Sequence, residues 1–106
     1  MILLKTITQI DQINDPTLRR VISQRFNEPF DPDIDGYGIL IEPGDTPEDL
    51  ESEVGLALFE GTPIEWVEEH PGCFELTLIP DVGDFGISIY LPKDSGIDPR
   101  FFELCS

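Results

Sequence analysis

Residues 64–91 read IEWVEEHPGCFELTLIPDVGDFGISIYL and contain three strand-like runs separated by two turns. Apolar and polar side chains alternate over 73–79 and 85–91, which is the period of a half-buried β-strand. The turn at 70–72 is His-Pro-Gly, which places Pro and Gly where a type II turn needs them. This stretch therefore predicts an antiparallel meander with strands over 64–69, 73–79 and 85–91.

A residue that can cap a helix, followed by Pro, occurs twice upstream of the meander. The dipeptide Asp-Pro at 15–16 precedes apolar residues at helical spacing and predicts a helix over 16–26. The tripeptide Asp-Thr-Pro at 45–47 predicts a short acidic helix over 47–54, which ends at a glycine.

Three weaker signals complete the secondary structure. A strand is expected over 37–41, a short turn or helix over 8–13 with Thr8 and Asp11 as a capping pair, and a last short helix from Pro99. The 106 residues form a single domain over 1–106. We predict an α+β fold: an antiparallel sheet of about four strands with two to three short helices packed mainly on one face.

The composition is strongly acidic, with 6 Lys and Arg against 22 Asp and Glu and a formal net charge of −16. Such a balance argues against direct binding of nucleic-acid phosphates or of anionic membranes, because both need a basic surface. The N-terminal residues lack the charge-first pattern of a signal peptide, so a cytoplasmic protein is expected. In that compartment Cys73 and Cys105 are expected to be reduced thiols.

The charges are also unevenly distributed. Residues 26–92 contain 17 carboxylates and no Lys or Arg, so internal ion pairs cannot neutralise this region. We expect a binding module that recognises a basic protein surface, of the immunity-protein, inhibitor or nucleic-acid-mimic type. The candidate contacts are Glu48, Asp49, Glu51, Glu65, Trp66, Glu68 and Glu69.

Two alternatives remain open for this acidic region. Trp66 is either an exposed interface anchor among carboxylates or simply a core residue. The acids themselves either form a recognition surface or only keep a soluble domain with no dedicated acidic site in solution.

A calcium site is a further alternative, because residues 31–42 match the pattern of an EF-hand calcium loop. The resemblance to that loop covers twelve residues and implies oxygen ligands from Asp31, Asp33, Asp35, Tyr37 and Glu42. The flanking prolines and the strand expected after residue 36 depart from the EF-hand pattern. An acidic turn that precedes a strand explains the same residues.

Catalytic signals are few, and no enzyme activity is expected. His70 and Cys73 form a His-x-x-Cys pair, and a third zinc ligand would have to come from Cys105 or a carboxylate. The chain contains no P-loop and no dinucleotide-binding glycine motif.

Overall fold

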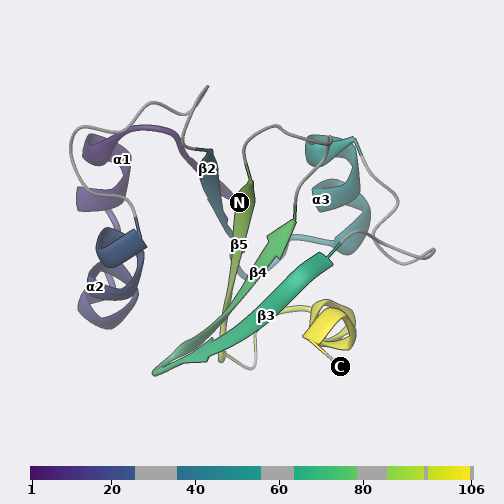
Figure 1. Ribbon diagram of the computed structural model, residues 1–106. Helices are drawn as coiled ribbons and strands as arrows, with labels where there is room; N and C mark the ends of the chain where they lie inside the picture. Colours follow the sequence, from purple (N-terminus) through teal and green to yellow (C-terminus); the bar gives the residue numbers. More distant parts are fainter. Residues whose placement is uncertain (26–35, 56–63, 79–85, 95, 106) are drawn as a thin grey trace.

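The computed structural model describes residues 1–25, 36–55, 64–78, 86–94 and 96–105. Within these ranges the chain forms helices and a mixed sheet (Figure 1). The elements are β1 (Ile2–Leu4), α1 (Ile7–Asp11), α2 (Pro16–Arg25), β2 (Tyr37–Leu40), α3 (Pro47–Val54), β3 (Ile64–His70), β4 (Cys73–Leu78), β5 (Ile87–Pro92) and the 3-10 helix η1 (Pro99–Cys105).

The described strands form a five-stranded sheet in the order β1-β2-β5-β4-β3. The α+β class is confirmed, but the sheet is larger than predicted and is not wholly antiparallel. The exception is β5, which lies between β4 and β2 and runs parallel to β2. A purely antiparallel meander would have placed β5 at the end of the sheet, whereas here it joins the β3–β4 hairpin to the N-terminal strands.

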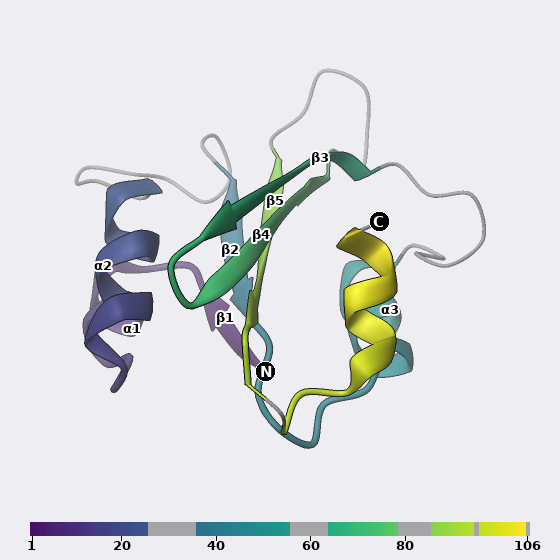
Figure 2. The same cartoon turned by 90° about the horizontal axis from the view of Figure 1, so that it is seen from below.

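The helices cover both faces of the sheet, so the prediction of helices mainly on one face was wrong. Figure 2 shows α1 and α2 on one side and α3 and η1 on the other. The reason lies in β5, where Ile87, Ile89 and Leu91 pack in the core with α3 and η1. Tyr90, on the opposite face of the same strand, packs with α1 and α2. Both faces are therefore apolar enough to need a covering layer.

The helix boundaries follow from their caps. In α2, Asp15 Oδ1 accepts from the backbone N–H of Thr17 and Leu18, as the predicted Asp-Pro start requires. In α3 the predicted bounds are confirmed, and Thr46 forms a capping box with Asp49. The predicted capping pair of α1 was wrong, because Thr6 and Gln9 cap the helix instead of Thr8 and Asp11.

The β3–β4 hairpin turns at Pro71-Gly72, as predicted, and Gly72 has the positive φ of 88° that this turn requires. A bulge between positions 64 and 66 shifts the register of β3. It breaks the simple alternation that the sequence predicted between Ile64 and Glu68.

Candidate functional site

The acidic residues predicted to contact a partner lie on two separate elements. Glu48 and Asp49 are exposed on α3, where Glu51 is partly buried. On β3, at one edge of the described sheet, Glu65, Glu68 and Glu69 are exposed. The side chain of Trp66 lies outside the described residues, so the two interpretations of this residue are not distinguished.

Cations from the end of the chain contact one acid in each group. Arg100 donates to Glu48 Oε1 at 2.7 Å and also binds Asp98, and these bonds lower the pKa of both carboxyls. Lys93 lies 2.5 Å from Glu69. Asp49 has a structural role in the α3 cap, since its carboxylate accepts from the backbone N–H of Thr46.

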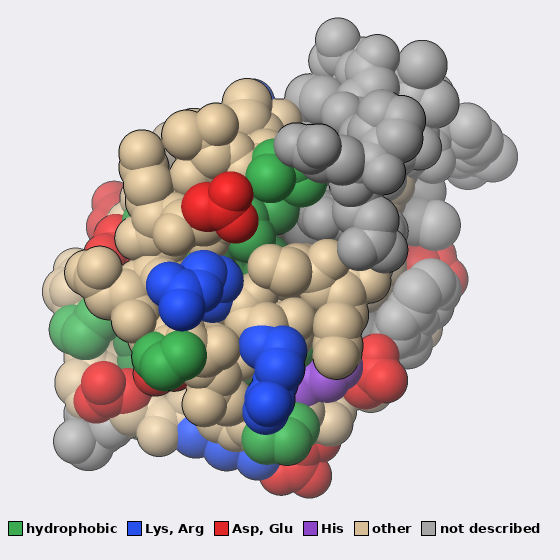
Figure 3. Space-filling model, turned by 90° about the vertical axis from the view of Figure 1, so that its left-hand side faces the viewer, with side chains coloured by type: hydrophobic (Ala, Val, Ile, Leu, Met, Phe, Trp, Pro, Cys, Tyr) green, Lys and Arg blue, Asp and Glu red, His purple; other side chains and the backbone are tan. Residues whose placement is uncertain are grey.

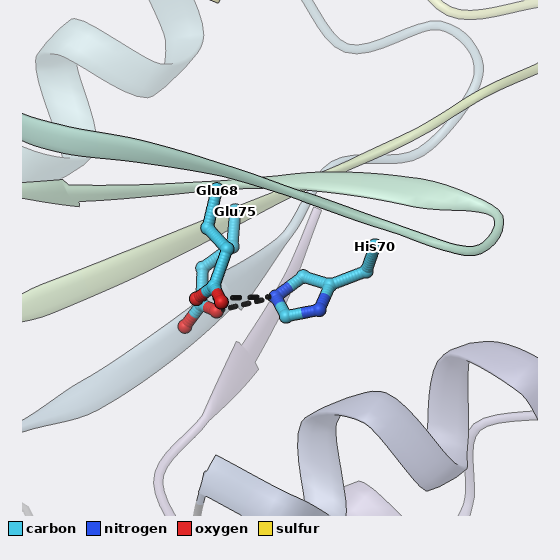
Figure 4. Close-up of side chains that lie close together, drawn as sticks. All are labelled: Glu68, His70 and Glu75. Carbon is cyan, nitrogen blue, oxygen red and sulfur yellow. Dashed lines mark hydrogen bonds and ion pairs between the residues drawn. The ribbon is translucent and has the colours of Figure 1, made fainter.

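A compact cluster of ionisable side chains lies on the α1–α2 face of the β3–β4 hairpin (Figure 4). Glu68 lies opposite Glu75 across the hairpin, and His70 lies opposite Cys73, so all four project from the same face of the sheet. His70 Nε2 is 2.8 Å from Glu75 Oε1 and 3.7 Å from Glu68 Oε2. We call Glu68, His70 and Glu75 the hairpin cluster.

Glu75 is the buried member of the hairpin cluster, with only 6% of its surface exposed. A buried carboxylate needs strong polar partners to offset the lost hydration. One is Tyr90 on the neighbouring strand β5, whose hydroxyl donates to Glu75 Oε2 at 2.9 Å. The second oxygen of Glu75 faces His70. Both oxygens of the buried carboxylate therefore point at defined partners.

Cys73 does not form a nucleophilic pair with His70. The thiol is fully buried, and this burial, with the nearby Glu75 charge, raises its pKa from 9.0 to about 11. The thiol therefore stays protonated near neutral pH, where a nucleophile would need the thiolate. The other cysteine, Cys105, packs in the core on the opposite side of the sheet.

A groove of about 610 Å³ lies between the α1–α2 connection and the strand ends. Its lining combines apolar and charged side chains and does not include His70. The apolar part of the lining includes Ile2, Ile13, Leu18 and Leu40, and the charged part consists of Asp15, Glu42, Lys93 and Asp94.

The predicted calcium loop falls mainly outside the described residues, which include neither Asp31, Asp33 nor Asp35. Tyr37 begins β2, and Glu42 follows this strand as an exposed residue whose backbone N–H donates to Asp45. The calcium hypothesis stays a prediction.

Sequence reasoning missed the role of Glu75. Its place in an alternating run predicted a solvent-facing side chain, because one face of the strand was expected to be open. The α1–α2 layer buries that face. Only the strand register shows that Glu68 on β3 lies opposite Glu75 on β4, and that Tyr90 on β5 lies opposite Glu75 on its other side.

Comparison with protein-family models, with curated proteins and with solved structures finds no match. Among the described helices, none combines the length and the apolar character needed to cross a membrane.

Proposed function

We propose that the protein is a small binding module that recognises a basic surface on another protein. The observation that carries this proposal is the exposure of Glu65, Glu68 and Glu69 along β3. Within the described part of the chain, the Lys and Arg residues provide one ion-pair partner for these three acids: Lys93, which contacts Glu69. This edge of the sheet thus presents more negative charge than the fold neutralises.

The distribution of cations supports the same conclusion. Figure 3 shows the α1–α2 side, where Lys and Arg side chains lie among scattered carboxylates. Arg19 and Arg20 come from α2 itself, whereas β3 contains no Lys or Arg. The two elements therefore carry opposite charge, and a basic partner would be attracted towards β3 rather than towards α2.

The acidic edge also has an apolar contact point. Val67 shares the α3–η1 face of β3 with Glu69, because these two residues lie opposite Leu76 and Phe74. It has 38% of its surface exposed, the greatest exposure of any large hydrophobic side chain in the described part of the chain. Carboxylates at the rim would speed association with a cationic surface, and an apolar centre would add buried area. The acids of α3, Glu48 and Glu51, provide a second candidate contact region.

An inhibitor or immunity-type role would follow if the basic partner is an enzyme that acts on nucleic acid, because spaced carboxylates can occupy sites meant for phosphates. This version rests on size and charge alone. The identity of the partner decides it.

The test uses the immobilised protein to capture binding partners from a lysate of the host, at about 50 mM and at about 500 mM NaCl. Exposed charges are screened much more strongly at the higher salt concentration. Two variants each remove two negative charges, Glu65→Gln with Glu69→Gln on β3, and Glu48→Gln with Glu51→Gln on α3. Asp11→Asn with Glu42→Gln is the matched control, since both acids are exposed and lie on neither β3 nor α3.

We expect a partner of basic isoelectric point that the wild type and the control retain at low salt and release at high salt. The β3 variant should retain much less of it. Loss in the α3 variant alone would move the site to α3. Equal capture by all variants, or a partner that is not basic, would contradict the proposal.

A further inference from the structure

We propose that the hairpin cluster, Glu68, His70 and Glu75, binds a divalent transition-metal ion such as Zn²⁺. The inference concerns the α1–α2 face of the hairpin and does not depend on the proposed partner. It rests on the geometry of the ligand atoms, on their charge, and on the way the fold holds them.

The geometry places three ligand atoms around one point. One atom from each residue can be chosen so that all lie within 4.8 Å of one another. The separations from His70 Nε2 are 2.8 Å to Glu75 and 3.7 Å to Glu68. Two ligand atoms of a tetrahedral Zn²⁺ lie about 3.4 Å apart, given metal–ligand bonds near 2.1 Å. These two separations bracket that value. The third ligand pair, Glu68 and Glu75, lies within 4.8 Å, and a movement of the exposed Glu68 side chain would bring all three atoms around one ion.

The charges call for a cation at the same point. Ionised carboxylates are acceptors only, and the Nε2 atom of a neutral His with its proton on Nδ1 is an acceptor too. Such atoms repel one another unless a proton or a metal lies between them. A proton on His70 offsets one of the two negative charges, whereas a divalent ion beside neutral His70 offsets both. The nitrogen ligand favours Zn²⁺, Cu²⁺, Ni²⁺ or Fe²⁺ over Ca²⁺ or Mg²⁺.

The sheet holds the ligands in place before any ion arrives. Glu75 comes from an interior strand, and Tyr90 fixes the orientation of its carboxylate through Oε2, which leaves Oε1 directed at His70. A hydrogen-bonded carboxylate ligand of this kind is a common feature of metal centres. Figure 4 shows Glu68 and Glu75 side by side, with His70 facing both from the end of the hairpin.

The cluster is open on one side. Glu68 is 60% exposed, so an ion can enter from solvent, and three protein ligands leave a position for water. Tyr90 is a positioning residue in this arrangement, because its hydroxyl contacts the ligand Glu75.

The experiment titrates Zn²⁺ into the chelator-treated full chain by calorimetry and follows Co²⁺ binding by visible absorption. Glu68→Gln removes an exposed ligand and should not affect folding, which circular dichroism checks. Glu69→Gln is the matched control, because it removes the same charge from the next residue, which lies opposite Phe74 rather than Glu75.

We expect one Zn²⁺ per chain in the wild type and in Glu69→Gln, and an affinity at least tenfold weaker in Glu68→Gln and Tyr90→Phe. His70→Gln should also change the Co²⁺ spectrum through loss of its nitrogen ligand. The inference is overturned if the wild type shows neither bound ion nor a change in melting temperature at about 1 mM Zn²⁺. It is also overturned if Glu68→Gln and Glu69→Gln bind with equal affinity.

Discussion

Tyr90 and Glu75 lie opposite each other on β5 and β4, and the buried Tyr90 hydroxyl donates a 2.9 Å hydrogen bond to Glu75 Oε2. This bond gives the buried carboxylate its most protected partner. Tyr90→Phe removes the donor and keeps the ring, so it should lower the free energy of unfolding by about 1.5–3 kcal/mol. Urea denaturation of the chelator-treated protein measures the change. A loss under about 0.5 kcal/mol would show that this bond does not hold Glu75.

Gly36 is expected to tolerate no side chain. Its φ is +89°, and an added Cβ would come within 2.1 Å of the Gly86 carbonyl oxygen, where the chain enters β2 and β5. Gly36→Ala should lower the free energy of unfolding by about 2 kcal/mol or more, because backbone atoms must move to accommodate the methyl group.

Gly44→Ala is the control for this prediction, since Gly44 has a φ of +97° and nothing within 4 Å of the added Cβ. Gly44→Ala should lower the free energy of unfolding by about 1 kcal/mol, because alanine is strained by the left-handed backbone conformation even where there is space for its side chain. Equal losses in the two variants, measured by denaturant unfolding, would show that the contact with Gly86 is unimportant.

Ser88 offers a stabilising substitution. Its hydroxyl is buried on β5, and no described group forms a hydrogen bond with it. Ser88→Ala should raise the free energy of unfolding by about 1 kcal/mol, because an unsatisfied polar group leaves the interior. A melting temperature below that of the wild type would reveal a partner for the hydroxyl.

Cys73 should be chemically inert in the folded protein. Its raised pKa, about 11, and its burial both keep the thiol protonated and inaccessible. Iodoacetamide at pH 8 should modify the partly exposed Cys105 first and Cys73 only after denaturation, as peptide mass spectrometry would show. Modification of both at equal rates would contradict the structure.

The same pKa shift sets a pH dependence. The folded pKa of Cys73 lies above the ordinary value of 9.0, so its contribution to stability is complete below pH 9. This contribution declines as the pH rises from 9 towards 11, because the unfolded thiol ionises first. Replacing the thiol in Cys73→Ala should flatten the fall in stability over that window relative to the wild type. An equally steep fall in both proteins would assign it to other groups.

The local elements of this fold were largely predictable from the sequence. The hairpin at Pro71-Gly72 and the helix from Pro47 carry their own signals, because turn and cap chemistry depends on neighbouring residues. The arrangement of the strands was not predictable in this way. The residues of β5 carry no local pattern that predicts its position between β4 and β2. The strand β1 has three residues, which are too few to show an alternation of apolar and polar side chains.

The candidate site was predictable only in part. The exposure of Glu65, Glu68 and Glu69 follows from charge, because too few cations exist to pair with them. The hairpin cluster depends on register and on the burial of a strand face. These features placed Glu75 against His70 and Tyr90, although its sequence pattern predicted an ordinary exposed acid.

The salt dependence of affinity for the captured partner tests recognition by the β3 acids most directly. We predict that the dissociation constant of the wild type rises at least about tenfold between about 50 mM and about 500 mM NaCl, and that Glu65→Gln with Glu69→Gln binds more weakly and depends less on salt. An affinity that salt leaves unchanged, or a β3 variant that follows the wild-type curve, would contradict the account.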